Sequence, residues 1–261
     1  MDRRTGLAQS FPILNVRHAG GGSCVHLSEQ NGVRSLHLGN SMVQSAMRLT
    51  VPNQLELAYT RCMMGFMLFN PRPANILMIG LGGGSLAKFV YHRLHGARAT
   101  VIEINPKVVV AARNHFFVPP DDERLQVLIG EGGEYVADHP ASADVLMVDG
   151  FDDCCQVASL CTPDFYDHAR AALKRNGILV VNLLSRSRGF QNYLRRIDNS
   201  FSGHVATLAV DPRGNLIAFA FRQNPGRRVW EDLPERAKKL ENEFGLPFTE
   251  FARNLRRRKP P

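Results

Sequence analysis

The sequence predicts a doubly wound α/β fold with a mostly parallel sheet, preceded by a small antiparallel β module. Two observations support this prediction. Short apolar runs alternate with segments of helical period between residues 75 and 182, and Asn31-Gly32 separates two alternating segments near the N-terminus. Buried parallel strands read as continuous apolar runs, and Asn-Gly is the strongest short hairpin signal. We expect a β-hairpin module over 1–52, a main α/β domain over 53–225, and a C-terminal helix with a basic tail over 226–261.

The N-terminal module should be built from segments such as Val25-His26-Leu27 and Leu36-His37-Leu38, on either side of Asn31-Gly32. Pro52 then interrupts the chain, and a helix is expected before Pro71. Its apolar face would consist of Leu55, Tyr59, Met63, Phe66 and Met67. We interpret the methionines in this stretch as packing residues of the core, because their flexible side chains fill irregular gaps.

The strongest signal lies between Asn75 and Glu103. Ile76–Ile79 is an apolar run that ends at the glycine-rich turn 80–84, and the next run, 99–102, ends at Glu103. Between them, apolar residues recur at helical spacing at Leu86, Phe89, Val90 and Leu94. A strand, a glycine turn, a helix and a second strand in this order form a βαβ unit.

The alternation of strands and helices continues downstream. The expected elements are a helix over 108–116, strands over 125–129 and 145–148, a helix from Thr162 through Leu173 closed by Asn176-Gly177, a strand over 178–182, a helix around Tyr193, and a hairpin of 205–210 with 216–221. Thr162 is a suitable N-cap for its helix because its hydroxyl can accept a backbone N–H. Residues 230–256 should form an amphipathic helix followed by the tail.

Composition excludes several classes of protein. No apolar run approaches the roughly 18 residues that cross a membrane, and the N-terminus lacks the apolar stretch of a secretory signal, so we expect a cytoplasmic protein. The five cysteines cannot all pair, and we expect reduced thiols. The net charge of +8 is concentrated in Arg253–Lys259, which we interpret as a solvated tail. Nucleic acid is an unlikely partner, because no aromatic residues interleave these arginines.

The glycine turn and Glu103 indicate a nucleoside ligand. Glycines at 80, 82 and 84 let the backbone approach a ligand at the start of a helix, and a carboxylate about 20 residues later can accept both hydroxyls of a ribose. The nicotinamide fingerprint fits less well, since it would place Ser85 in its last glycine position. The spacing G-x-G-x-G is typical of Rossmann-like folds of the S-adenosylmethionine-dependent methyltransferase type.

Further acidic residues follow other predicted strands. Glu131-Gly132 comes after the strand 125–129, and Asp149 ends the strand 145–148 with Asp152 three residues later. Ligands of open parallel sheets bind beyond the carboxyl ends of the strands, where these residues would converge. Two carboxylates facing one pocket suit the binding of a cationic amine and removal of its proton, so Asp149 and Asp152 are the candidate catalytic residues. We expect no metal.

From Leu36 to about Val181, the chain resembles the spermidine synthase family, aminopropyltransferases that use decarboxylated S-adenosylmethionine. The family's I-G-G-G-D-G turn is similar to 79–84, its V-D-S-S-D-P loop to 148–153, and its S-L-F-T-x-x-F-Y segment to 159–166. The resemblance implies that Gly80, Gly82, Gly83, Gly84, Glu103, Glu131 and Gly132 bind the donor nucleoside, with Gln44 contacting it from the β module. It also implies that Tyr59 and Asp152 bind the acceptor amine.

The chain departs from the family at three places. Gly83 stands where the family has an aspartate that contacts the aminopropyl amine, Thr60-Arg61 replaces a His-Glu pair of the acceptor site, and Asp153 replaces a proline. An arginine in the acceptor site would repel a polyamine. Conversely, the amides of a glycine-only turn would favour the carboxylate of S-adenosylmethionine.

Three functions therefore stay open at this point. The first is aminopropyl transfer to a small-molecule amine, and the second is methyl transfer from S-adenosylmethionine to a small molecule. The third is nucleoside binding without catalysis, with the basic tail docked on an acidic partner. We also expect a homodimer.

Overall fold

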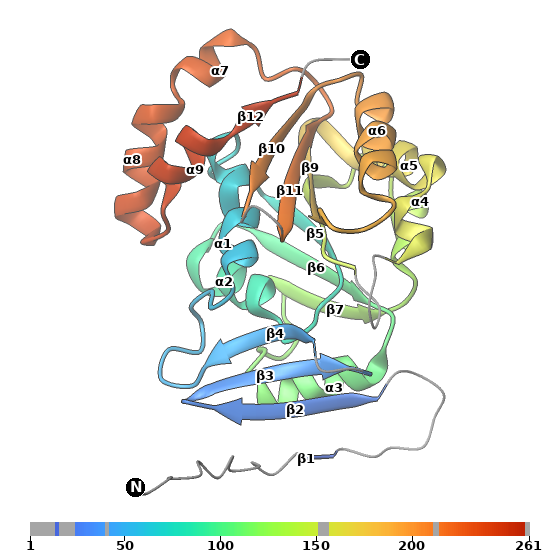
Figure 1. The fold of residues 1–261 in the computed structure, drawn as a ribbon, viewed down its shortest axis with the longest axis vertical. Coiled ribbons are helices and arrows are strands. Elements are labelled where there is room, and N and C mark those ends of the chain that lie inside the picture. The colour runs from blue at the N-terminus through green and yellow to red at the C-terminus, as the bar shows by residue number, and fades with distance from the viewer. Residues whose placement is uncertain (1–13, 16–23, 40–41, 151–156, 211–213, 259–261) are drawn as a thin grey trace, which may run out of the picture.

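A computed structural model describes residues 14–15, 24–39, 42–150, 157–210 and 214–258. Its larger sheet contains β5 (Asn75–Ile79), β6 (Arg98–Glu103), β7 (Leu125–Ile129), β8 (Ala143–Val148), β9 (Leu173–Leu184), β10 (Val205–Ala209), β11 (Asn215–Phe221) and β12 (Arg256–Arg257). The strand order is β12-β10-β11-β9-β8-β5-β6-β7. The strands from β9 to β7 are parallel, and β11, β10 and β12 extend the sheet antiparallel (Figure 1). This confirms the predicted fold class.

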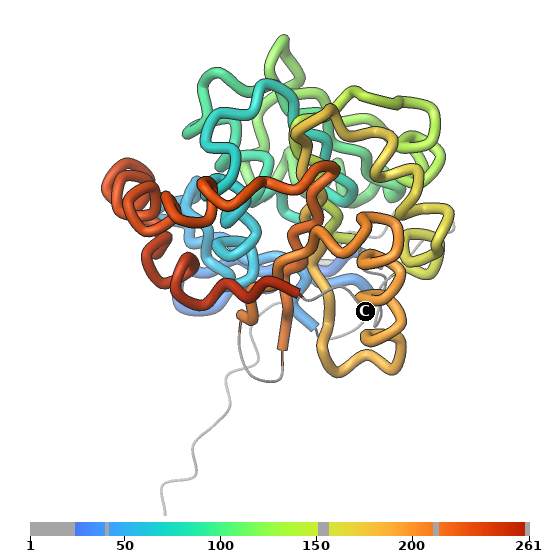
Figure 2. The backbone as a smooth tube through the Cα atoms, turned by 90° about the horizontal axis from the view of Figure 1, so that it is seen from above, coloured from blue at the N-terminus to red at the C-terminus, as the bar shows by residue number. Residues whose placement is uncertain are grey.

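Helices cover both faces of this sheet (Figure 2). One face packs against α4 (Gly132–Asp138), α5 (Pro163–Ala172) and α6 (Phe190–Ser200), and the short 3-10 helix η2 (Ala158–Cys161) precedes α5. The other face packs against α1 (Ala58–Met63), the 3-10 helix η1 (Met64–Leu68), α2 (Ser85–Arg93), α3 (Pro106–His115), α8 (Leu233–Phe244) and α9 (Phe248–Asn254), with α7 (Arg227–Glu231) before α8. Apolar burial on both faces accounts for the continuous apolar runs of the parallel strands.

The N-terminal module is a small antiparallel sheet of β1 (Leu14–Asn15), β2 (Val25–Gln30), β3 (Val33–Leu38) and β4 (Val43–Arg48). Asn31 and Gly32 join β2 to β3, and both have positive φ, which is the geometry that favours Asn-Gly in two-residue hairpins. Leu27, Leu36 and Met47 belong to the same apolar core as residues of α2 and α3. The module thus packs against α2 and α3 at the lower end of the molecule in Figure 1, where α3 lies beside β2 and β3.

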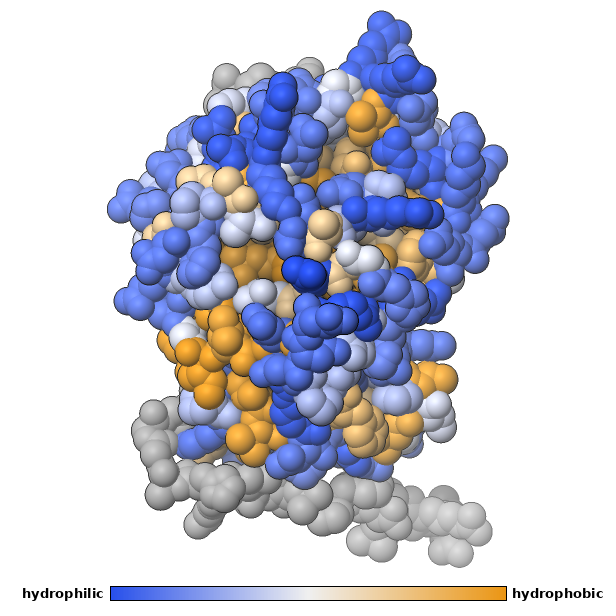
Figure 3. Space-filling view, turned by 180° about the vertical axis from the view of Figure 1, so that it is seen from behind, coloured by the Kyte–Doolittle hydropathy of each residue, from blue (hydrophilic) through white to orange (hydrophobic). Residues whose placement is uncertain are grey.

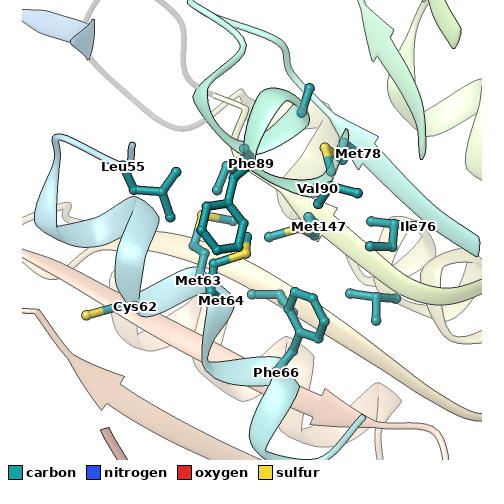
Figure 4. Packing of buried hydrophobic residues seen from close by; sticks show 14 of the residues in the cluster. Leu55, Cys62, Met63, Met64, Phe66, Ile76, Met78, Phe89, Val90 and Met147 are labelled. Atoms are coloured by element: carbon teal, nitrogen blue, oxygen red, sulfur yellow. The ribbon is translucent and has the colours of Figure 1, made fainter. Parts of the chain in front are cut away.

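The structure differs from the prediction of one amphipathic helix before Pro71. The segment forms α1 and then continues as the 3-10 helix η1, and every residue from Cys62 to Leu68 is buried. Met63, Met64 and Phe66 lie among Phe89, Met78 and Met147 (Figure 4). A helix enclosed on all sides has no solvent face, so apolar periodicity could not define its type or length. The interpretation of these methionines as core residues is confirmed.

In the C-terminal half, one prediction was wrong and another was correct only in part. Helix α5 begins at Pro163 with Thr162 as its cap, as predicted, but it ends at Ala172, and Asn176-Gly177 lies inside β9. The tail is solvated only in part, since Arg253, Arg256 and Arg257 are exposed but two of them lie in a strand. Arg256 and Arg257 pair with β10, and the Arg258 guanidinium donates to the buried Asp198 carboxylate at 2.7–2.8 Å. The tail's arginines are thus partly structural.

Two further observations complete the fold. Within the described ranges no helix is long and apolar enough to span a bilayer. Cys24, Cys62 and Cys161 are free thiols, as expected, whereas Cys154 and Cys155 lie outside the described residues. The domain boundaries at 52/53 and 225/226 stay predictions.

Candidate active site

A cavity opens at the carboxyl ends of β5, β6, β7 and β8, where the candidate residues were expected to converge. Its lining residues are Leu38, Gln44, Ser45, Tyr59, Ile79, Gly80, Gly82, Ile102, Glu103, Ile104, Val108, Gly130, Glu131, Gly132, Asp149, Gly150, Val157 and Leu160. Three of these described side chains are carboxylates, and none is a lysine, arginine or histidine. The cavity therefore favours a cationic ligand.

The glycine turn uses its backbone amides within the protein. The N–H of Gly80 donates to Ile102 O (2.9 Å), that of Leu81 to Glu103 Oε2 (2.9 Å) and that of Gly84 to Leu81 O (2.8 Å). The Gly82 amide also bonds to the Glu103 carboxylate, and the Gly83 amide donates to Ser45 Oγ (2.8 Å). The turn thus offers none of these five donors to an incoming carboxylate.

Gly80 has a structural reason to be glycine. Its φ is +94°, and a β-carbon at this position would lie 2.5 Å from the backbone oxygen of Asp149. Only a residue without a side chain allows the turn after β5 to approach the end of β8 this closely. This contact brings Asp149 beside the glycine turn.

Glu103 is buried at the end of β6 and shapes the turn opposite it. Its Oε2 accepts the Leu81 N–H, and its Oε1 accepts the Asn105 N–H at 2.9 Å. Burial raises the pKa of this carboxyl, and the backbone amides around it oppose that shift. The amides of Gly82 and Ile104 also bond to this carboxylate, so four backbone donors fix its position at the edge of the cavity.

Glu131 and Gly132 lie at the start of α4, at the neighbouring strand end. Glu131 is the N-cap, with Oε2 accepting the Glu134 N–H at 2.7 Å, and Ser159 Oγ donates to its Oε1 at 3.3 Å. Its half-buried carboxylate lines the cavity. It has spare acceptor capacity for an amino group such as that of adenine.

Asp149 is the centre of a polar chain. Asn182 Nδ2, on β9, donates to Asp149 Oδ1 at 2.8 Å, and the Tyr59 hydroxyl also bonds to this carboxylate. Burial raises the pKa of Asp149, and these two hydrogen bonds oppose that shift by stabilising the charged form. Burial and the neighbouring Asp149 charge raise the pKa of Tyr59 well above its usual value, so it remains a neutral donor.

The N-terminal sheet contributes the cavity wall opposite the main sheet. Gln44 and Ser45 on β4 both line the cavity, and the Tyr59 hydroxyl lies 3.2 Å from the Gln44 carbonyl oxygen. Ser45 is buried and accepts the Gly83 N–H. The module thus completes a site that the main sheet leaves open on one side.

The three departures from the family pattern have different structural consequences. Gly83 and Gly84 are absent from the described lining of the cavity, and a β-carbon at Gly83 would face Phe116 and Ser45 at 2.8–3.0 Å. The Arg61 guanidinium donates to the carbonyl oxygens of Leu55 and Glu56 at 2.7–2.8 Å, and buried Thr60 donates to Leu57 O. Neither lines the cavity, so the expected repulsion of a polyamine by Arg61 is not supported. Asp152 and Asp153 lie outside the described residues.

Sequence reasoning missed three residues of this site, namely Ser45, Asn182 and Asn215. Asn215 Nδ2 on β11 donates to Asn182 Oδ1 at 2.7 Å, and Asn182 in turn contacts Asp149. The only available signal was a polar Asn182 at the end of an apolar run, since the pairing of β9 with β11 joins residues 33 positions apart.

Comparison with known proteins shows what the chain is similar to. A family model described as the spermine/spermidine synthase domain matches residues 56–210. The polyamine aminopropyltransferase of Chromobacterium violaceum is 41% identical over 232 residues, which cover 89% of each protein. A crystal structure of a probable spermidine synthase from Corynebacterium glutamicum has a TM-score of 0.70 at 21% identity, covering 95% of this chain and 94% of the other. A spermidine synthase bound to the transition-state analogue AdoDATO has a TM-score of 0.67 at 23% identity, covering 87% and 80%.

Proposed function

The chain belongs to the spermine/spermidine synthase family, and on this premise we propose that it transfers an aminopropyl group from decarboxylated S-adenosylmethionine to a small-molecule amine. The observation that carries the proposal is the charge of the cavity: Glu103, Glu131 and Asp149 line it, and no described lysine, arginine or histidine does. Both reactants are cations, since the donor carries a sulfonium and an ammonium and the acceptor is an amine. A wall of carboxylates concentrates and orients such reactants.

The adenosine part of the donor would lie along the ends of β5, β6 and β7. We assign Glu103 to the ribose hydroxyls and Glu131 to the adenine amino group, with the turn 80–84 beneath them and Gln44 closing the cavity from β4. Support comes from the position of both carboxylates in one cavity and from the spare lone pairs of Glu131. These assignments apply to either form of the donor.

The occupied amides of the glycine turn favour the decarboxylated donor. S-adenosylmethionine would bring a carboxylate into a cavity that already holds three, and the five turn amides are committed to Ile102, Glu103, Ser45 and Leu81. An unpaired carboxylate desolvated there is costly, whereas an ammonium is welcome. The expectation that the turn would attract a carboxylate thus loses its physical basis, and methyl transfer loses its main support.

We assign the proton transfer to Asp149. A lone pair on the acceptor nitrogen attacks the methylene carbon beside the sulfonium, a C–N bond forms, and the C–S bond breaks to leave a thioether nucleoside. The nitrogen must lose one proton, which Asp149 accepts as general base. Its burial makes it a stronger base than a solvated aspartate, and Tyr59 and Asn182 orient it. Asp152 is proposed to hold a second charge of the acceptor, and no metal takes part in this scheme.

Asp149→Asn tests this assignment. The amide keeps the shape of the carboxylate but cannot accept a proton, so turnover should fall by roughly 10² to 10⁴ while donor affinity changes little. Asp138→Asn, an exposed aspartate at the end of α4, is the matched control and should keep full activity. Near-normal turnover in Asp149→Asn would show that another group takes the proton.

We propose further that the protein acts in the cytoplasm as a homodimer. Val110, Phe117, Leu128 and Ile129 are 40–61% exposed, and a second copy of the chain could cover these apolar side chains. They belong to α3, to the loop two residues beyond its end, and to the edge strand β7. Apolar areas gather in the lower half of the back face, the end that holds the N-terminal sheet (Figure 3). Light scattering of the wild type and of Phe117→Asp tests the dimer: a wild-type monomer would contradict it.

A further inference from the structure

A chain of polar side chains crosses the main sheet and ends at the proposed base. It starts at Asn215 on β11, passes through Asn182 on β9 and reaches Asp149 at the end of β8, with donor–acceptor distances of 2.7 and 2.8 Å. Asn182 is only 1% exposed, although its neighbours on β9 are apolar. A buried amide in such surroundings is costly unless its hydrogen bonds are made, so its presence calls for a reason.

The direction of the chain fixes the orientation of Asn182. An asparagine amide has a donor end and an acceptor end, and a rotation by 180° exchanges them. Because Asn215 donates to Oδ1 of Asn182, the Nδ2 of Asn182 is turned toward Asp149. A donor facing a carboxylate stabilises its ionised form, whereas the opposite orientation would bring two oxygens together and require a protonated aspartate.

We propose that Asn182 and Asn215 are positioning residues that hold Asp149 ionised and oriented toward the acceptor amine, with Asn182 bonded to its Oδ1. This inference rests on the proposed function of Asp149 as the base. Asn182 acts through Asp149, and Asn215 acts through Asn182. The two amides thereby favour the ionised form of Asp149, as a neighbouring cation would.

The other groups around Asp149 explain why such support is needed. Burial raises the pKa of Asp149, and Glu103 and Glu131 add two more carboxylates to the same cavity. No described cationic side chain lines the cavity, so Asn182 from β9 and Tyr59 from α1 supply the hydrogen bonds that favour the charged form. Tyr59 divides its single proton between Asp149 and the Gln44 carbonyl, which leaves Asn182 as the steadier donor.

The experiment compares three variants with the wild type. Asn182→Leu removes the amide at similar volume, Asn215→Ala removes the orienting donor, and Asn215→Asp replaces that donor by an ionised acceptor of the same shape. Asn242→Ala, on the exposed face of α8, is the control. We measure kcat against pH at saturating decarboxylated donor and diamine, and donor affinity by calorimetry as a check that each variant is folded.

The inference predicts a specific order of effects. Asn182→Leu should move the acid limb of kcat upward by about one to two pH units, which lowers kcat about 10- to 100-fold at pH values on that limb. Asn215→Asp should do the same, since an acceptor at 215 turns the Nδ2 of Asn182 away from Asp149. Asn215→Ala should shift the limb by less than about half a unit, because Asn182 can still face Asp149. If Asn215 had only a structural role, the truncation Asn215→Ala would lower kcat more than Asn215→Asp, which keeps the shape of the side chain.

Each outcome decides a different point. If Asn182→Leu and Asn215→Asp are active and the acid limb of kcat stays in place in both, the inference is overturned and the proposed function is unaffected. If Asn182→Leu no longer binds the donor, the two Asn215 variants test the inference instead. A smaller shift of the acid limb in Asn215→Asp than in Asn215→Ala would then overturn the inference. A wild type that transfers no aminopropyl group to any diamine overturns the proposed function, and the inference with it.

Discussion

Replacing Glu103 should damage the protein in two separable ways, because its carboxylate both shapes the glycine turn and faces the cavity. In the absence of donor, Oε2 accepts the Leu81 N–H and Oε1 accepts the Asn105 N–H, each at 2.9 Å. The residue is 8% exposed, so water cannot easily replace the lost acceptor. Glu103→Ala therefore leaves the buried N–H of Leu81 and the partly buried N–H of Asn105 without a partner, and it also removes the contacts of the Gly82 and Ile104 amides.

The expected magnitudes follow from these contacts. A buried donor without an acceptor costs about 1–3 kcal/mol, and a partly buried one less, so Glu103→Ala should lower the free energy of unfolding by about 2–4 kcal/mol without donor. Loss of the charge-assisted contact to the ribose should also weaken donor binding by about 1.5–3 kcal/mol, or roughly 10- to 150-fold in Kd. Glu103→Gln keeps one acceptor and should be less destabilising than Glu103→Ala.

Denaturant unfolding of the donor-free protein measures the first effect, and calorimetric titration measures the second. Glu134→Ala, an exposed glutamate in the first turn of α4, is the control and should change the free energy of unfolding by less than about 0.5 kcal/mol. If Glu103→Ala unfolds like the wild type, the carboxylate does not hold the turn. If it is destabilised but binds donor with unchanged affinity, Glu103 is a structural residue and its assignment to the ribose is wrong.

Three further predictions concern groups away from the chemistry. Lys88 is buried and donates to Phe116 O and Pro52 O, and burial lowers its pKa to about 8 from 10.5, so its contribution to stability is complete above pH 10.5 and lost as pH falls through 8. Between pH 7 and 9.5 the free energy of unfolding of the wild type should therefore gain about 2 kcal/mol relative to Lys88→Met, and parallel pH curves would contradict this. Arg258→Met strands the buried Asp198 carboxylate and should cost about 1.5–3 kcal/mol in denaturant unfolding, whereas Arg228→Met, whose ion pair with Asp232 is exposed, should cost less than about 0.5. Burial raises the pKa of the Cys62 and Cys161 thiols to about 11, so mass spectrometry after alkylation at pH 8 should find both far slower to react than exposed Cys24.

Local patterns predicted those parts of the fold that local interactions determine. The strands of the parallel sheet, the βαβ unit and the hairpin at Asn31-Gly32 are each marked by residues close together in the sequence, namely apolar runs, a glycine turn and the Asn-Gly pair. The change from α1 to the 3-10 helix η1 had no such signal, because residues 62–68 are all buried and give no contrast between faces on which helical periodicity depends. The start of β9 at Leu173 and the pairing of β12 with β10 depend on partners far away in the chain, and no local pattern encodes them.

The same division applies to the site. Gly80, Glu103, Glu131 and Asp149 could be predicted because each follows a strand whose end is fixed by the fold. Ser45 could not, because its contact with the Gly83 amide depends on how the N-terminal module packs against the turn. The direction of the Arg61 side chain was equally hidden, since it is decided by the carbonyl groups of the preceding loop.

The most direct test of the central claim is one competition reaction. The protein is incubated with equal concentrations of decarboxylated S-adenosylmethionine, S-adenosylmethionine and a small diamine, and the amine products are identified by mass spectrometry. The carboxylate-lined cavity and the occupied turn amides predict an amine extended by an aminopropyl group, with the decarboxylated donor consumed and S-adenosylmethionine left intact. A methylated amine, or consumption of S-adenosylmethionine in preference to the decarboxylated donor, would contradict the account.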